Sequence, residues 1–379
     1  MVAVVLSAAK DLMPVASAMR SFASLRMTEG ATREMLPPEK SSGGFIVMLR
    51  RTFAAALPLA LFAPPTRAQA PKKLVVYTSN DSTLNDLVFG AFKAETGIEV
   101  EPVAAGSGVV MRRLQAEKAR PLGDIVWGVS RSLLQTNKAL FEPYASRNIA
   151  ATPAEYRDAD NLWIGNNLHL LVILQNTKIV PDADAPKSWA DLLDPKWKGK
   201  IAFTDPANSG SAYTTVTMLV DLWGGGEAGW KKVAQLFKNM KVLNRSSLVF
   251  QGVGNGEYPL GISLEYAGPM WAQGGAPVKV IYPSDGTFAA MEGVAIIKDD
   301  PNPESAKAFV DYINRKDVRE MILKATYRRP TRSDVDLTAL PGGMPPLSQV
   351  KLINYDEEGW TEKRTKTLEQ IKDVLQDSR

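Results

Sequence analysis

Cysteine is absent from this chain of 379 residues, and histidine occurs only once. Without cysteine the chain has no disulfide, no thiolate nucleophile, no iron–sulfur cluster and no cysteine-ligated zinc. A single histidine also excludes a metal centre built from several imidazoles. The whole chain is 45% apolar and 23% charged. This composition is typical of globular proteins and excludes a disordered or fibrous chain. The length exceeds that of one ordinary core and predicts two lobes.

An excess of positive charge is also missing once the first 70 residues are set aside. The whole chain has 45 basic and 41 acidic side chains, but residues 1–70 hold eight basic and four acidic ones. The remaining residues therefore carry 37 side chains of each sign. A neutral balance provides no broad positive field for nucleic acid, so we expect no nucleic-acid partner.

A short apolar run near the start predicts export. The Arg50-Arg51 pair precedes apolar residues 53–63, which are too few to cross a hydrocarbon core that needs ~20 residues. Ala68 and Ala70 form the small-residue pattern of a cleavage site, and cleavage after either residue is consistent with it. We therefore interpret residues 48–70 as a signal peptide and expect a periplasmic protein.

The residues before this signal are unusual, because signal peptides begin near their start codon. Residues 1–47 show no sustained amphipathic period. Our hypothesis is that translation starts at Met48 or Met35, and the alternative is a genuine upstream extension. The arginine pair is compatible with a twin-arginine signal, although we favour an ordinary secretory signal.

Short apolar strands alternate with helical runs in the first part of the mature chain. Residues 74–77, 98–103 and 125–127 have the pattern of strands, and residues 84–96 and 109–119 have that of helices. Gly97 is placed to end the first of these helices. This alternation is typical of a parallel sheet that is covered on both faces.

The second part of the chain repeats the alternation. Apolar residues 168–175 and 291–297 are expected to cross between the lobes, and two crossings form a hinge that lets the lobes close about a ligand. We predict an α/β fold whose first lobe contains residues 71–167 and 285–335 and whose second contains residues 168–284 and 336–379. The expected strands and helices of this part are 201–204, 211–223, 227–238, 260–264, 278–282, 303–314, 317–325 and 361–376.

Four turns rich in hydroxyl groups and glycine follow predicted strands. At that edge of a parallel sheet, the N-termini of helices direct free N–H groups into a crevice and suit a phosphate, phosphonate or carboxylate. Helix capping alone also explains each single turn. The candidate ligand-binding residues of these turns are Ser79, Asn80, Gly106, Ser107, Gly108, Ser130, Asp205, Ser209, Gly210 and Ser211.

Several of these runs together resemble a known family. Residues 124–128 (DIVWG), 188–201 (SWADLLDPKWKGKI), 205–211 (DPANSGS) and 255–266 (NGEYPLGISLEY) are similar to runs in extracellular solute-binding proteins of ABC importers. The similarity is to the group with ferric-iron, thiamine, phosphonate and hexose-phosphate binders, and it covers about residues 72–335. It implies a type II periplasmic-binding-protein fold with two lobes, each a mainly parallel sheet flanked by helices. It also implies membrane permease subunits as partners.

The resemblance leaves the ligand open. Ferric-iron binders of this group use two adjacent tyrosines at the end of a second-lobe strand, often with a histidine and a glutamate. Here that place has only Tyr266, and the single histidine, His169, lies in an apolar run where we expect a structural role. We therefore expect no metal and no cofactor, and a small anionic organic solute such as a phosphate or phosphonate. Iron held with a synergistic anion is the alternative.

Other polar residues near the expected crevice have two interpretations each. Glu265 fits a carboxylate that accepts hydrogen bonds from sugar hydroxyls or pairs with an amino group, or else a salt bridge at the rim. Tyr213 and Tyr266 either stack on the ligand or pack beneath it. Arg112 could reach an anion in the cleft. The run of arginines at 328–332 is expected on the surface, where it would meet the importer.

An exported enzyme is the third hypothesis, with Glu265 and Asp205 as the carboxylates of a glycosidase. The sequence offers no recognisable acid–base spacing for such a pair, and no serine or threonine has an evident base. We expect a monomeric binding protein rather than an enzyme.

Overall fold

A long buried strand joins two sheets in the computed structural model, which describes residues 73–338 and 340–378. The predicted signal peptide and the residues upstream of it lie outside the described residues. β5 (Ile164–Asn176) pairs with β10 (Ala289–Ile297) through its first half and with β8 (Leu260–Leu264) through its second half. All 13 residues of β5 are buried, which explains its continuous apolar sequence.

The first sheet is built around β1 (Lys73–Thr78), which runs parallel to both of its neighbours. The other strands of this sheet are β2 (Glu99–Ala104), β3 (Ile125–Ser130), β4 (Phe141–Glu142), β10 and β11 (Arg329–Pro330). Its helices are α2 (Ser82–Thr96), α3 (Ser107–Ala116), α4 (Arg131–Thr136), α9 (Pro303–Ile313) and α10 (Lys316–Thr326). Buried apolar clusters cover both faces of the sheet.

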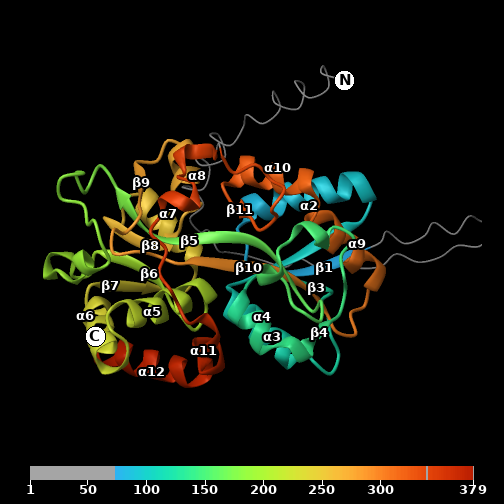
Figure 1. The fold of residues 1–379 in the computed structure, drawn as a ribbon, viewed down its shortest axis with the longest axis horizontal. Coiled ribbons are helices and arrows are strands. Elements are labelled where there is room, and N and C mark those ends of the chain that lie inside the picture. Colours follow the sequence, from blue (N-terminus) through green and yellow to red (C-terminus); the bar gives the residue numbers. More distant parts are fainter. Residues whose placement is uncertain (1–72, 339, 379) are drawn as a thin grey trace, which may run out of the picture. The chain divides into compact units, whose positions relative to one another are not determined.

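The second sheet is built around β6 (Ile201–Thr204), which is parallel to β7 (Met240–Leu243) and β8. β9 (Val278–Ile281) pairs with the end of β5. The helices on this side are α5 (Gly210–Leu222), α6 (Gly226–Phe237), α7 (Ser246–Gly254), α8 (Ala267–Gln273), α11 (Glu357–Glu362) and α12 (Arg364–Asp377). The two-lobed α/β fold is confirmed, and β5 and β10 run antiparallel to the strands beside them (Figure 1). The residue boundaries of the lobes stay a prediction.

Most of the predicted helices match observed ones to within three residues at each end. α2 begins after Asp81, whose carboxylate accepts a hydrogen bond from the N–H of Leu84 at 3.1 Å. It ends at Gly97, which has φ of 70°, as predicted. This left-handed conformation favours glycine because it has no Cβ atom.

Two expectations about elements were wrong, and two elements were missed. Gly128–Ser130 is not a turn, because β3 continues to Ser130 and pairs there with Glu292 of β10. Residues 361–376 are not one helix, because α11 ends at Glu362 and α12 begins at Arg364. β7 and α7 escaped prediction, since β7 is short and half of its residues are exposed.

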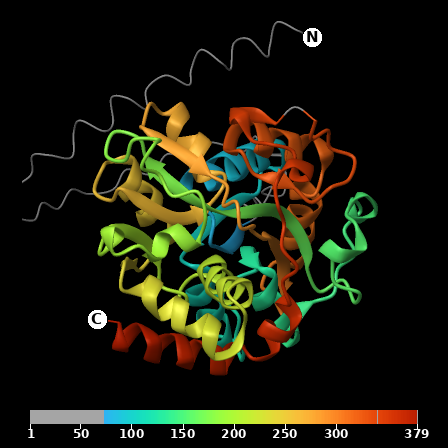
Figure 2. The same cartoon turned by 60° about the vertical axis from the view of Figure 1, so that its left-hand side comes forward.

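The chain crosses between the two sheets a third time after β11. Residues beyond it return to the second sheet, where the N–H of Ile353 donates to the carbonyl of Thr287 at 2.9 Å. α11 then contacts α4 of the first lobe, and α12 packs along α6 (Figure 2). The C-terminal segment therefore touches both lobes, which belong to one compact unit.

Candidate functional site

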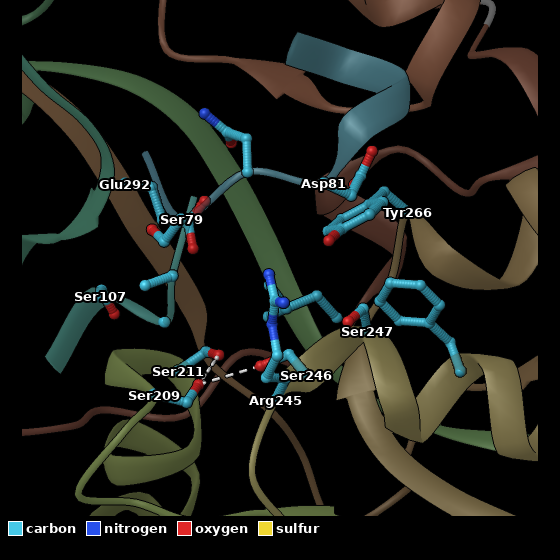
Figure 3. Close-up of a pocket in the computed structure, with 15 residues that line it drawn as sticks. Ser79, Asp81, Ser107, Ser209, Ser211, Arg245, Ser246, Ser247, Tyr266 and Glu292 are labelled. Carbon is cyan, nitrogen blue, oxygen red and sulfur yellow. Dashed lines mark hydrogen bonds between the residues drawn. The ribbon is translucent and has the colours of Figure 1, made fainter. Parts of the chain in front are cut away.

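A small pocket lies between the two lobes and is lined mainly by turns that follow strands. Its volume is about 60 Å³, which is room for roughly four or five water molecules. Figure 3 shows the side chains around it. The lining residues are Ser79, Asn80, Asp81, Ala105, Gly106, Ser107, Ser209, Ser211, Arg245, Ser246, Ser247, Phe250, Leu264, Tyr266 and Glu292.

Four helices begin at this pocket, namely α2, α3, α5 and α7. The first-turn N–H groups of a helix have no acceptor within the helix, and they give its N-terminus a partial positive charge. The Ser209 hydroxyl caps α5 and lies 3.0 Å from the Ser211 hydroxyl and 3.2 Å from the Ser246 hydroxyl (Figure 3). Hydroxyls from two helix N-termini thus form one connected row that can donate to an oxyanion.

The turns of the two lobes touch each other directly beside the pocket. The N–H of Gly108 donates to the carbonyl of Asn208 at 3.1 Å, and the N–H of Gly210 donates to the Ser107 hydroxyl at 2.9 Å. A Cβ atom on Gly108 would lie 2.3 Å from the carbonyl oxygen of Ala207, and one on Gly210 would lie 2.1 Å from the Ser130 hydroxyl. Glycine is therefore required here for contact between the lobes.

Arg112 also holds the lobes together. Its guanidinium donates to the carbonyl of Ala207 at 2.8 Å and to the side-chain oxygen of Asn208 at 2.9 Å. The side chain is exposed and does not line the pocket. The structure thus gives Arg112 a neutral partner in the opposite lobe and not the anion that its sequence position suggested.

A buried arginine supports one wall of the pocket. Arg328 forms an ion pair with Asp81, and its guanidinium lies 3.7 Å from the centre of the Tyr266 ring. Burial acts to raise the pKa of Asp81, but the charge of Arg328 and nearby N–H groups hold that pKa below its usual value. Burial raises the pKa of Tyr266 well above that of a free phenol. Asp81 is thus charged and Tyr266 neutral at pH 7.

The single histidine lies next to residues that line the pocket. The Nε2 atom of His169 lies 3.1 Å from a carboxylate oxygen of Glu292, and its ring centre lies 5.2 Å from that of Tyr266. His169 is buried on β5, whereas Glu292 on β10 lines the pocket. Both strands join the lobes, so these side chains connect the pocket to the hinge.

Seven of the predicted ligand-binding residues line the pocket. They are Ser79, Asn80, Gly106, Ser107, Ser209, Ser211 and Tyr266. Gly108, Ser130 and Gly210 lie where the two lobes meet, beside the pocket. Contact with a solute stays a prediction for all of them.

The other three predicted residues have partners elsewhere. Asp205 accepts from the N–H of Ala207 at 2.8 Å and so caps its own turn. Tyr213 is buried, and its hydroxyl donates to the carbonyl of Trp360 at 2.7 Å. Arg364 of α12 also packs on Tyr213, with its guanidinium 4.0 Å from the centre of the ring. Neither predicted side chain lines the pocket.

Glu265 is the clearest departure from the expected site. Both of its oxygens accept hydrogen bonds from Arg329 at 2.7 Å, and the Tyr282 hydroxyl donates to one of them at 2.6 Å. Glu265 and Arg329 are each only 1% exposed. The pair links the end of β8 in the second lobe to β11 in the first, so Glu265 stabilises the hinge instead of facing the pocket.

The surface position expected for the arginines at 328–332 was also wrong. Arg328, Arg329 and Arg332 are all buried, and each has a carboxylate partner. A run of charged residues normally predicts a surface segment, because isolated charges are costly to bury. The partners that offset this cost come from distant parts of the chain for Arg328 and Arg329.

Five polar lining residues were absent from the predicted set, and they are Asp81, Arg245, Ser246, Ser247 and Glu292. Asn244-Arg245-Ser246-Ser247 is another polar turn after a strand, and recognising β7 would have identified it. Arg245 is exposed at the pocket. Glu292 lies within an apolar crossing strand, where one charged residue is itself a signal.

Two further searches concern metals and membranes. Among residues 73–338 and 340–378, no three His, Asp or Glu side chains are grouped so that they could hold a metal ion. Within the same ranges, no helix combines the length and the apolar character needed to cross a membrane.

Residues 121–357 match the sequence profile of a family described as bacterial extracellular solute-binding protein. An uncharacterized protein of Haemophilus influenzae is 28% identical, with 83% of this chain and 94% of that protein covered. A putative 2-aminoethylphosphonate-binding periplasmic protein of Salmonella typhimurium is 25% identical, with 67% and 76% covered. An Fe(3+)-binding periplasmic protein of Serratia marcescens is 25% identical, with 67% and 77% covered.

A solved structure is similar to the whole two-lobed fold. It is the periplasmic binding protein AfuA from Actinobacillus pleuropneumoniae with fructose-6-phosphate bound. The TM-score is 0.74 at 25% identity, and the match covers 80% of this chain and 99% of that one.

Proposed function

The chain belongs to the bacterial extracellular solute-binding protein family, and from this premise we propose that its pocket captures a small organic phosphate or phosphonate. It is a binding protein of the ABC-importer type, so its task is to close over a solute and deliver it to permease subunits. Binding of this kind makes and breaks no covalent bond. The periplasm is the compartment that the named relatives occupy, and we propose it for this chain.

The proposal rests on the hydroxyl groups and helix N-termini from both lobes that lie together at the pocket. Ser107, Ser209, Ser211 and Ser246 belong to the first turns or caps of α3, α5 and α7, which come from both lobes. A phosphate or phosphonate group has three oxygens that each need donors once water is excluded. N–H groups and hydroxyls at helix N-termini supply those donors together with a favourable partial charge.

One named relative and one solved structure support the same ligand class. One is named for 2-aminoethylphosphonate, and AfuA was solved with fructose-6-phosphate. Both ligands combine a tetrahedral oxyanion with a polar organic part. We infer that this chain takes a ligand with the same two parts.

Ferric iron with a synergistic anion is the second candidate, because a relative is named for Fe(3+) and Tyr266 lines the pocket. Fe(III) prefers anionic oxygen ligands such as phenolate. Burial raises the pKa of Tyr266, and both oxygens of Asp81 are already engaged, by Leu84 and Arg328. These features make the pocket a better match for an oxyanion than for iron.

The proposed role is binding without catalysis. The two carboxylates suggested for a hydrolase are Glu265 and Asp205, and neither lines the pocket. Glu265 is ion-paired with Arg329, and Asp205 caps a turn. Neither carboxylate is free to act as acid or base on a bound solute.

A binding screen on the mature chain tests the proposal. A ligand present at 100 times its dissociation constant stabilises a protein by about 2.7 kcal/mol. For a chain of this size, that gain corresponds to a rise in melting temperature of roughly 4 °C. We expect this rise with 2-aminoethylphosphonate or a hexose phosphate, and none with ferric citrate. The reverse pattern, or a coloured iron complex, would overturn the proposal.

Arg245 provides a sharper test at the pocket itself. It is exposed, lines the pocket and is a cation that an incoming anion meets at the N-terminus of α7. Hydrogen bonds to charged groups contribute about 1.5–3 kcal/mol, so Arg245→Gln should weaken binding of the phosphate-bearing ligand by ~10- to ~100-fold. Arg120→Gln, on an exposed segment after α3, is the matched control and should leave binding unchanged. Equal effects of both substitutions would contradict the role of Arg245.

A further inference from the structure

We propose that Glu292 selects the solute by accepting a hydrogen bond from an ammonium or hydroxyl donor on its organic part. This inference rests on the proposed function, because it concerns the other end of the same ligand. Glu265 was the carboxylate expected to do this from the sequence, but Glu265 is committed to Arg329. Glu292 supplies a carboxylate inside the pocket instead.

The position of Glu292 is fixed by the sheet. It lies on β10, where its backbone is opposite Ser130 of β3 and Asn167 of β5. Its side chain is only 17% exposed. In the view of Figure 3, Glu292 and Ser79 lie on the other side of the pocket from Ser209 and Ser211. The carboxylate therefore faces the pocket from the side opposite the row of hydroxyls.

One oxygen of Glu292 is occupied and the other is available. The Oε2 atom lies 3.1 Å from Nε2 of His169, which is buried and packs against Tyr266. Within residues 73–338 and 340–378, the Oε1 atom has no hydrogen-bond partner. His169 thus holds the carboxylate in place and leaves one oxygen free to accept from a ligand.

The second carboxylate of the pocket has no such free oxygen. One oxygen of Asp81 accepts from the N–H of Leu84 at 3.1 Å, and the other is paired with Arg328. Its charge is therefore balanced within the protein. Of the two acidic residues that line the pocket, Glu292 is the one with capacity for a ligand.

The two sides of the pocket then match the two parts of one ligand. The N-termini of α5 and α7, with Ser209, Ser211, Ser246 and Arg245, form the side for the oxyanion, and Glu292 forms the side for a donor. A partly buried acceptor that finds no donor in the bound ligand costs free energy, so a site built to use one rejects ligands that lack it. The solute class is accordingly a phosphate or phosphonate whose short organic part ends in an amine or a hydroxyl.

Calorimetry with four probes tests this inference on the mature chain. The probes are 2-aminoethylphosphonate, fructose 6-phosphate, ethylphosphonate and inorganic phosphate. Ethylphosphonate has the oxyanion but no donor on its organic part. We expect at least one of the two donor-bearing ligands to bind ~10- to ~100-fold more tightly than ethylphosphonate, which is the range for hydrogen bonds to a charged group.

Two substitutions separate an ammonium donor from a hydroxyl donor. Glu292→Gln keeps an acceptor oxygen but removes the charge, so it should weaken an amine-bearing ligand by ~10-fold or more and a hydroxyl-bearing ligand by only ~3-fold. Glu292→Ala should remove the preference for either. Glu101→Gln, which changes an exposed glutamate on β2, is the control. A ligand-free melting temperature equal to that of the wild type reports that each variant is folded.

The outcomes distinguish the two proposals. If the wild-type chain binds none of the four probes, both the proposed function and this inference fail. If it binds them but does not prefer a donor-bearing ligand, only the role of Glu292 fails. Loss of ethylphosphonate binding equal to the loss for the preferred ligand in Glu292→Gln would also refute that role, since it would place Glu292 at the oxyanion.

Discussion

Replacing Gly108 by alanine should separate the contribution of lobe closure from the stability of the lobes themselves. Gly108 lies in the first turn of α3, and its N–H donates to the carbonyl of Asn208 in the opposite lobe. An added Cβ atom would lie 2.3 Å from the carbonyl oxygen of Ala207 and 3.2 Å from its carbonyl carbon. These are backbone atoms, so they cannot move aside as a flexible side chain would.

The added methyl group destabilises only the arrangement in which the two lobes are in contact. Overpacking costs typically 1–3 kcal/mol, and the hydrogen bond between Gly108 and Asn208 contributes about 1 kcal/mol. Losing both weakens any binding that requires closure by about 2–4 kcal/mol, which is ~30- to ~1,000-fold in the dissociation constant. With the lobes apart, the same substitution favours the helix by up to about 1 kcal/mol, because alanine is a better helix former than glycine.

Calorimetry and thermal unfolding of Gly108→Ala measure these two opposed effects. The variant should bind the cognate solute far more weakly than the wild type while its ligand-free melting temperature stays the same or rises. Gly90→Ala is the matched control, because Gly90 lies in α2 and a Cβ atom there meets nothing within 4 Å. The control should gain helix stability and keep its affinity.

The result that would refute the reasoning is specific. If Gly108→Ala binds its solute as tightly as Gly90→Ala does, contact between the two turns is not needed for binding. A large fall in ligand-free stability with unchanged affinity would have the same meaning.

Two further predictions concern carboxyl groups, one buried and one partly exposed. Glu265→Ala leaves Arg329 buried without its partner, so the free energy of unfolding should fall by about 3–5 kcal/mol, and adding Arg329→Met should restore much of it; a melting temperature equal to that of the wild type would contradict this. Burial and the charge of Asp124 raise the pKa of Asp300 to about 6. The folded chain therefore binds the proton of the Asp300 carboxyl more tightly than the unfolded chain does. The free energy of unfolding accordingly falls as pH rises from about 4 to 6. Asp300→Asn should therefore stabilise the chain at pH 7.5, by about 1 kcal/mol for a partly exposed group, and hardly at pH 4; equal melting curves of variant and wild type at pH 7.5 would exclude it.

The sequence alone determined the kind of fold and the composition of most of the turns. Strand and helix patterns alternate along the chain, and each pattern depends only on neighbouring residues. β1, α2 and the end of α2 at Gly97 were therefore predictable. The turns at 205–211 and 106–108 were recognisable for the same reason, because a helix cap is local. A run such as DPANSGS also carries the family resemblance by itself.

Only the tertiary structure decided which polar groups face the pocket. Glu265 and Glu292 both follow apolar strand residues, yet one pairs with Arg329 and the other faces the pocket. The partner of Arg328 lies 247 residues earlier in the chain, at Asp81. A hydrophobic pattern reports where apolar side chains are buried, but a buried arginine and a solvated one look the same in a sequence. Their difference depends on a partner that folding brings from far away, and no local pattern contains it.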